Sequence, residues 1–305
     1  MKVTVETKKN LENYLPKKCI KVFVKNVLFS TAKISLKFYP NADIDSFDNS
    51  LTKVKKAKFP GVKFGNNVLI GREVGIGLSA GSSNNVFMGR LAGCIPYGSS
   101  NTILGYNAGQ CISKASNSVF IGVNAGRGPA VDATTAGCTS NHQVFIGNNA
   151  GRCYTSGCYN VVLGSNAAVN ASGGSYNFFA LNCSARYHCN GSNNIAIGQY
   201  AMFCGGCHAG DGSASNNILL GNHTGCRISS GDSNTFIGPS AGRSMCTGGS
   251  NIAFGNSALC ASTTPSQNIA MGSNSLQCNI SGGCNVSIGY QSSKCQVSGS
   301  GNINL

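Results

Sequence analysis

The sequence predicts an all-β protein whose main part is a parallel β-solenoid of about fourteen 17-residue turns. Three observations predict it: a strict period, apolar positions two residues apart, and a Gly that anchors each copy. The period is clearest where Asn251-Ile-Ala-Phe-Gly255 recurs as Asn268-Ile-Ala-Met-Gly272 and as Asn285-Val-Ser-Ile-Gly289. Copies this short cannot each form a helical pair, whereas stacked strand-and-turn units bury together a face that none buries alone.

The anchor recurs through four fifths of the chain. Thirteen anchors fit, twelve of them are Gly, and eight of the twelve gaps between them are 17 residues long. A half copy, Asn302-Ile-Asn-Leu305, follows the last anchor. Two longer gaps contain inserted segments, which we expect to leave the solenoid at the same edge, so that deleting residues 129–136 would preserve the fold. The anchors are Gly71, Gly89, Gly105, Gly122, Gly147, Gly164, Leu181, Gly198, Gly221, Gly238, Gly255, Gly272 and Gly289.

Other columns of the repeat describe one turn. Asn stands four residues before the anchor in twelve of fourteen copies, with Ser118 and Gln143 as exceptions, and predicts a hydrogen-bonded ladder. Apolar residues three and one before the anchor would share the buried face of a short strand. Ala three residues after most anchors suits a narrow interior, and Gly allows the turn. At about 4.8 Å per turn the solenoid would be a rod of roughly 60 to 65 Å.

Residues 1–65 do not repeat and are strongly basic. They hold fourteen Lys and five acidic residues, whereas residues 66–305 have a net charge of only +5. The stretch "CIKVFVKNVLFSTAKISLKFYP" alternates Lys with apolar residues, which predicts two strands or a hairpin. So short a segment makes a marginal core. We therefore expect a small β-rich docking or capping domain at 1–65 and the solenoid at 66–305, the Lys serving solubility or an anionic partner.

The repeats resemble known fibres. "SNSVFIGVNAG", "SGCYNVVLGSNA" and "GSNIAFGNSAL" resemble the repeats of bacteriophage tail fibres, notably the Cys-containing ones of marine cyanophages. They are also similar to the "SVAIG" repeats in the heads of trimeric bacterial adhesins. The resemblance covers residues 66–305. It implies a virion structural protein, a trimeric tail fibre or adhesin-like rod that binds a host surface or spaces other virion parts.

The same resemblance implies partners and a location. The N-terminal domain would contact other virion proteins, and the protein would belong to a virion assembled in the host cytoplasm. "MKVTVETKKNLENYL" has no apolar signal segment and no membrane anchor is recognisable, which fits a phage protein better than a secreted adhesin and predicts no membrane insertion. A capsid or baseplate decoration protein that bridges virion proteins is the alternative.

Enzyme signatures are weak. "NNVLIGREVGIG" reads like the hexapeptide repeat of acyltransferases, but the next position of that repeat holds Cys, Gln and Arg rather than aliphatic residues. A glycan depolymerase needs two close carboxylates, and the solenoid has only Glu73, Asp132, Asp211 and Asp232. Asp132 and Asp211 lie in the two insertions, about 19 Å apart along the stack. We expect no enzyme, with depolymerase and acyltransferase as the alternatives of that class.

Cysteines are frequent in the solenoid, which holds fifteen of the sixteen. Several recur five or six residues after an anchor, where a Cys would fill a corner as a small apolar residue. Synthesis in a reducing compartment favours free thiols. "CGGCH" matches the spacing of haem attachment, and Cys204, Cys207, His223 and Cys226 approach zinc spacing. Because an inserted loop explains these spacings, we treat the four as weak metal candidates and expect no cofactor.

Two further sets are candidate binding residues. Five basic residues stand five after an anchor and form a cationic column, which either keeps the rod soluble or contacts an anionic host-surface glycan in a salt-dependent way. Ile303 and Leu305 lie in a half strand without a charge or Pro to protect its edge. We expect a sister chain or another protein to cover them. The basic residues are Arg127, Arg152, Arg186, Arg243 and Lys294.

Overall fold

The computed structural model describes residues 4–7, 20–23, 66–79, 81–94, 98–112, 114–128, 141–154, 156–171, 173–188, 190–203 and 212–305. The chain divides into two compact units, Met1–Asn66 and Asn67–Leu305. In the first unit, β1 (Thr4–Thr7) pairs in parallel with β2 (Ile20–Phe23). β2 lies in the stretch predicted to form strands, but its partner comes from an earlier segment that the pattern did not single out. Residues 24–40, which hold the rest of that prediction, are outside the described residues.

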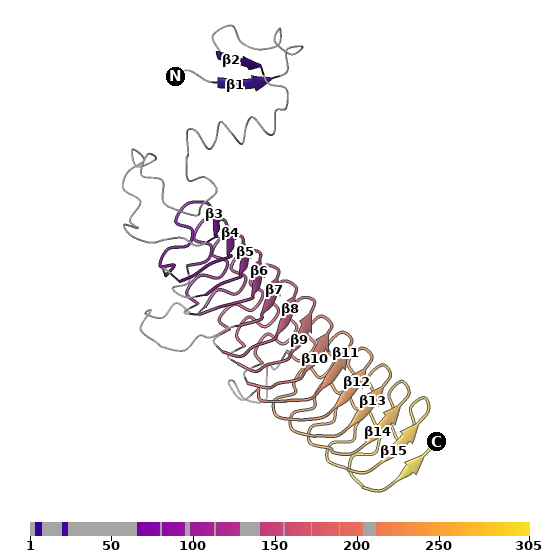
Figure 1. Ribbon diagram of the computed structural model, residues 1–305. Helices are drawn as coiled ribbons and strands as arrows, with labels where there is room; N and C mark the ends of the chain where they lie inside the picture. Colours follow the sequence, from indigo (N-terminus) through magenta and orange to yellow (C-terminus); the bar gives the residue numbers. More distant parts are fainter. Residues whose placement is uncertain are drawn as a thin grey trace. The chain divides into compact units, whose positions relative to one another are not determined.

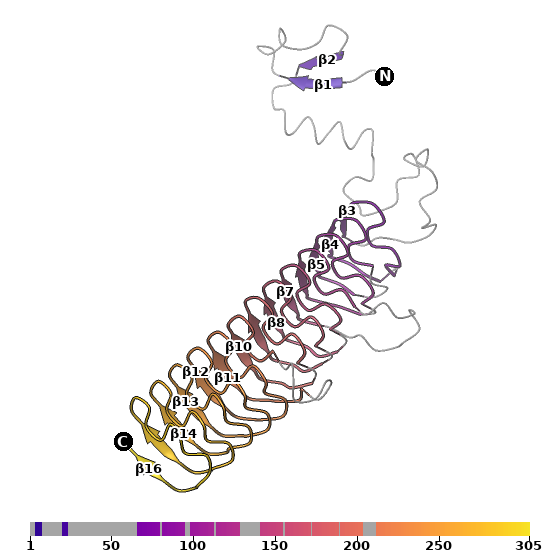
Figure 2. The ribbon, with the colours of Figure 1, turned by 180° about the vertical axis from the view of Figure 1, so that it is seen from behind.

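The second unit is a parallel β-solenoid, as predicted. Fourteen short strands form one parallel sheet in chain order, and the chain completes one coil between each strand and the next (Figures 1 and 2). The part of the chain that the structure describes contains no helix. The strands are β3 (Val68–Ile70), β4 (Val86–Met88), β5 (Thr102–Leu104), β6 (Val119–Ile121), β7 (Val144–Ile146), β8 (Val161–Leu163), β9 (Phe178–Ala180), β10 (Ile195–Ile197), β11 (Ile218–Leu220), β12 (Thr235–Ile237), β13 (Ile252–Phe254), β14 (Ile269–Met271), β15 (Val286–Ile288) and β16 (Ile303–Asn304).

Strand register survives both insertions. Across the longer one, Val119 pairs with Val144 and Phe120 with Phe145, although 25 residues separate each pair. Across the other, Ile195 pairs with Ile218. The inserted residues 129–140 and 204–211 are outside the described residues, so their common edge and the tolerated deletion stay predictions.

The strands bury the opposite face from the one we expected. In each strand the middle residue points inward, and the apolar residues on either side point outward: in β4, Phe87 is fully buried while Val86 and Met88 are exposed. The reason is the Asn column. Its side chains are buried, and side chains two apart share a face, so Asn at four before the anchor and the middle residue at two before it both point inward. The predicted buried pair at three and one before the anchor is therefore wrong.

One interior space per turn is filled by two positions that compensate for each other. They are the middle residue of the strand and the residue four after the anchor: where one is large the other is small, and only in the β15 turn, with Ser287 and Ser293, are both small. A Cβ added at Gly126 would lie 2.6 Å from the Phe120 ring, and one added at Gly225 would lie 2.9 Å from Leu219. The pairs are Leu69/Gly75, Phe87/Gly93, Ile103/Gly109, Phe120/Gly126, Phe145/Gly151, Val162/Ala168, Phe179/Ala185, Ala196/Met202, Leu219/Gly225, Phe236/Gly242, Ala253/Leu259, Ala270/Leu276 and Ser287/Ser293.

The Asn column forms the predicted ladder. Asn234 Nδ2 donates to Asn217 Oδ1 at 3.1 Å, and the backbone N–H of Asn234 donates to the same oxygen at 2.9 Å. The same Nδ2 also donates to the Gly248 carbonyl at 2.9 Å. Ser118 and Gln143 keep the ladder continuous, since the Gln143 N–H donates to Ser118 Oγ. Buried amides satisfied on both sides stabilise each turn on its neighbour.

The small-residue column and the turns also agree with the prediction. The Ala residues three after the anchor are fully buried. The Gly anchors have φ between 127 and 152°, a region that other residues avoid. A Cβ on Gly105 would run into the Gly122 carbonyl oxygen of the next turn, so the close stacking of turns requires Gly here.

Candidate interaction surface

The outward-pointing residues of the strands form a continuous apolar surface, which we call the outer face. It consists of the residues three and one before each anchor, from Val68 and Ile70 at β3 to Ile303 and Leu305 at β16. None of these positions holds a charged residue, and only Thr102 and Thr235 carry a polar group. The most exposed members are Val68, Ile70, Val86, Met88, Ile146, Ile195, Ile218, Ile252, Phe254, Met271, Ile288, Ile303 and Leu305.

This face is unusual for a surface in contact with water. Fourteen strands spaced about 4.8 Å apart, with three residues in each, give a face of roughly 600 Å² on one side of the rod. Contiguous apolar patches on single soluble chains rarely exceed that size. Parallel sheets, moreover, are ordinarily covered on both sides, and here the solenoid interior covers only one. The outer face has the composition of a buried surface.

A row of stacked rings lies beside the outer face. His142, Tyr159 and Tyr176 stand five before successive anchors and are exposed, with ring centroids 4.5 Å apart for the first pair and 5.1 Å for the second. All three have φ between 56 and 61°, which is uncommon for bulky side chains. Most other turns place Asn, Ser or Gln there. Stacking of the rings between turns offsets part of the energetic cost of this backbone conformation.

The predicted cationic column is divided. Arg127 and Arg152 lie on adjacent turns, because the N–H of Cys153 donates to the Arg127 carbonyl at 2.7 Å. Arg186 follows two turns later with Val169 between, and Arg243 and Lys294 lie further along. Within the part of the chain that the structure describes, none of the five forms an ion pair, and Nε of Arg127 and of Arg186 is buried without a hydrogen-bond partner.

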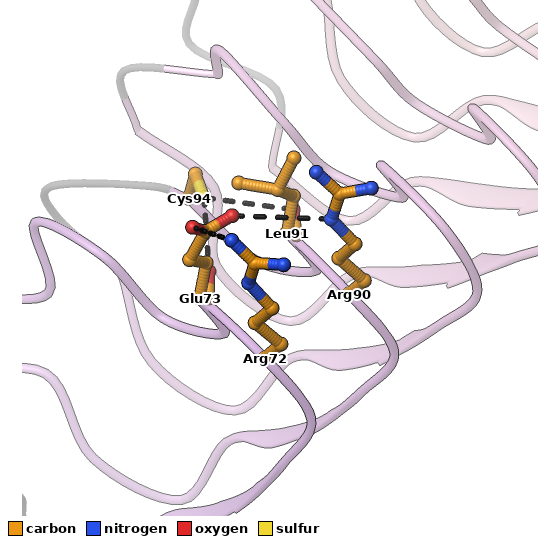
Figure 3. Close-up of polar contacts among 5 residues, drawn as sticks. All are labelled: Arg72, Glu73, Arg90, Leu91 and Cys94. Carbon is orange, nitrogen blue, oxygen red and sulfur yellow. Dashed lines mark hydrogen bonds and ion pairs between the residues drawn. The ribbon is translucent and has the colours of Figure 1, made fainter.

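The described acidic residues of the solenoid, Glu73 and Asp232, interact with groups outside the cationic column. Glu73 lies 3.4 Å from the Arg72 guanidinium and 3.9 Å from that of Arg90, and its carbonyl accepts a hydrogen bond from the Cys94 thiol (Figure 3). Asp232 Oδ1 accepts the Ser215 N–H at 2.6 Å. Glu73 follows β3 and Asp232 precedes β12, so the two do not share a site. Asp132 and Asp211 are outside the described residues.

The cysteines do not fill buried corners as we expected. Cys111 and Cys295 are exposed, and Cys94, Cys226 and Cys260 are partly buried. Among the described residues ten cysteines are free, whereas Cys246 is disulfide-bonded, contrary to the expectation of free thiols throughout. Burial raises the pKa of Cys94, Cys226 and Cys260, which keeps these thiols protonated and unreactive.

The metal candidates are not brought together in the described chain. The ring of His223 packs on that of Tyr200, with centroids 5.0 Å apart, and Cys226 is partly buried. Cys204 and Cys207 lie outside the described residues. Among the residues that are described, no three His, Cys, Asp or Glu side chains are grouped as a metal site requires.

Ile303 and Leu305 are the most exposed members of the outer face, at 73% and 89%. They continue it to β16, which pairs with β15 on one side. Covering of these two residues stays a prediction.

No protein-family model, curated protein or solved structure matches the chain. Of what the resemblance to tail fibres and adhesin heads implied, the structure confirms the parallel β-solenoid fold, and neither the structure nor the comparisons support a family. Over the described ranges, no helix is long and apolar enough to cross a membrane.

The outer-face residues are recognisable in the sequence as strand residues, but their predicted place in the interior is wrong. The signal that would have placed them correctly was the Asn column, since a ladder of Asn amides needs shelter from water and fixes which alternate positions point inward.

Proposed function

We propose that this protein is a non-enzymatic structural rod whose solenoid associates lengthwise with copies of itself through the outer face. It would serve as a tail-fibre-like virion component that binds a surface or spaces other parts. The observation that carries the proposal is an uncharged apolar face running along all fourteen strands.

The period of the outer face favours a copy of the same chain as its partner. A partner that covers the whole face must offer complementary apolar groups every 4.8 Å or so, and a second solenoid of this sequence has that spacing. The roughly 600 Å² available approaches the ~800 Å² that each partner buries in a stable interface. Three copies around a common axis, the number that the resemblance implies, would shelter every outer face from water.

The alternative partner is a different virion protein, as in a decoration protein. Such a partner would need its own apolar surface of matching length and period. In that case the basic segment 1–65 would dock the protein on the virion, because this segment differs from the solenoid in both charge and repetition.

The test is the mass of the full-length chain in solution, compared with that of a variant carrying Ile195→Lys and Ile252→Lys. Both residues are exposed on the outer face. We expect the unchanged chain to sediment as an oligomer of three, and the variant as a folded monomer, because burying unpaired lysines is costly. The matched control is Ser230→Lys with Thr247→Lys, two exposed positions nine after an anchor, which should leave the mass unchanged. A monomeric parent chain at every concentration would contradict the proposal.

A second, compatible role is favoured by the unpaired Arg side chains. Arg127 and Arg152 on adjacent turns have no acidic partner among the described residues, so they are available to an anionic glycan. Binding to a sulfated polysaccharide column should weaken as salt rises and as both are changed to Gln. Retention that depends on neither salt nor these residues would rule this role out.

A further inference from the structure

One turn of the solenoid departs from the repeat in three columns at once. At β9, Leu181 replaces the Gly anchor, Phe178 is the one aromatic residue at three before an anchor, and Ala180 is the one small residue at the position just before an anchor. These changes are concentrated in the seventh of the fourteen strands.

Leu181 strains the stack at this point. Its φ is 79°, and at every Gly anchor from Gly71 to Gly272 an added Cβ would lie within 2.7 Å of the next turn. The displacement is visible in the next backbone bond: the Gly198 N–H lies 3.2 Å from the Ala180 carbonyl, whereas the equivalent bonds at the other anchors, including Leu181 itself, are 2.7–2.8 Å. A Gly would have avoided this. A residue that breaks a local rule without a gain in the fold points to a role outside the fold.

The same changes make a landmark on an otherwise uniform surface. Leu181 is 55% exposed and Tyr176 is 61% exposed, while Ala180 is only 9% exposed. Tyr176 is held in place by stacking on Tyr159. We call Tyr176, Phe178 and Leu181 the β9 cluster.

We propose that the β9 cluster sets the axial register of self-association, its partner being a second copy of this chain. This inference rests on the proposed function. A uniform repeating face permits two rods to slide by one turn, about 4.8 Å, with almost the same contacts, just as uniform strands specify register weakly. The large side chains of the β9 cluster beside the small Ala180 remove this degeneracy. After a slip of one turn they would face a regular turn, which has Val or Ile three before the anchor, a large apolar residue one before it, and Gly at the anchor.

The experiment regularises the turn and reads the register by cross-linking. The variant Phe178→Val, Ala180→Ile, Leu181→Gly restores the repeat. A photoreactive benzoylphenylalanine replaces Phe254, which is 52% exposed on the outer face, in both the full-length parent and the variant. Mass spectrometry then identifies the turn of the neighbouring chain that is captured.

We expect the parent to cross-link to residues of a single turn, and the regularised variant to give products spread over turns 17 residues apart, with an unchanged oligomer mass and an equal or higher melting temperature. A matched control, Thr235→Val, should keep the single register. A single register retained by the variant, or several in the parent, would overturn this inference while leaving the proposed function intact. Monomeric protein without interchain products would instead overturn the proposed function and this inference with it.

Discussion

The turns of β6 and β13 fill the same interior space in opposite ways. In the β6 turn Phe120 comes from the strand and Gly126 makes room for it; in the β13 turn Ala253 is small and Leu259 fills the space from the far side. The outer positions show no such exchange, since Val119 and Ile121 correspond to Ile252 and Phe254. Inside, the chain compensates for its own changes. Outside, the positions stay apolar and uncharged apart from Thr102 and Thr235, and no second position in the same turn changes size with them; this is the pattern expected if another molecule covers the outer face, as proposed.

The largest expected effect comes from removing the side chain that fills the interior of the β6 turn. Phe120→Ala should reduce the free energy of unfolding by about 3–5 kcal/mol, because Gly126 leaves a cavity beside it. Adding Gly126→Leu gives the turn the small and large residues of the β13 turn, Ala253 and Leu259. This second change should recover a large part of the lost free energy of unfolding. Denaturant unfolding followed by circular dichroism measures both. If the double variant is no more stable than the single one, the two positions do not share one space.

The converse change overfills the β13 space. Ala253→Phe should destabilise the fold by about 3 kcal/mol, since Leu259 already occupies the volume that the ring needs. Leu259→Gly in the same chain should restore stability, because it reproduces the Phe120 and Gly126 arrangement. Ile252→Phe is the control: the same ring one residue earlier points outward, as Phe178 does, and should leave the melting temperature of the solenoid nearly unchanged.

A third comparison concerns two turns that place a polar residue seven after the anchor. His188 is fully buried with Nε2 3.2 Å from the Gly191 carbonyl, and Asn279 takes the same position, bonding the Gly282 N–H and carbonyl at 2.9 Å each. Burial lowers the pKa of His188 to about 4. Because the unfolded chain takes up this proton near pH 6.5, stability is fully present above that pH and is lost as pH falls toward 4.

The loss should reach roughly 2 kcal/mol by pH 5. His188→Asn, which copies the Asn279 arrangement, should remove this part of the acid sensitivity. The measurement is the denaturation midpoint at pH 7 and at pH 5 for both chains. Equal shifts in the two would show that His188 is not the group responsible.

The fold was predictable because its signals are local and repeated. A period of 17, the Asn ladder and the small Ala column each recur in most turns, and strand register follows from them. The inside-out assignment failed because three consecutive apolar residues such as Val119-Phe120-Ile121 do not by themselves show which face is buried. The pairing of β1 with β2 joins segments that do not repeat, so no pattern in the sequence predicted it. Leu181 is visible in the sequence as a break in the Gly column, but the longer hydrogen bond from Gly198 in the next turn to Ala180 is evident only from the structure.

The central claim is that the outer face is apolar because another copy covers it, and the methionines test this most directly. Met88 and Met271 lie on the outer face at 45% and 40% exposure, while Met202 and Met245 are fully buried. Oxidation by dilute peroxide follows exposure, and peptide mass spectrometry gives the rate at each residue.

In the assembled full-length protein we predict that Met88, Met202, Met245 and Met271 all oxidise slowly. In the Ile195→Lys and Ile252→Lys variant, Met88 and Met271 should become fast, while Met202 and Met245 stay slow inside the intact solenoid. Fast oxidation of Met88 and Met271 in the assembled parent chain would show that the outer face is not the interface and would contradict the account.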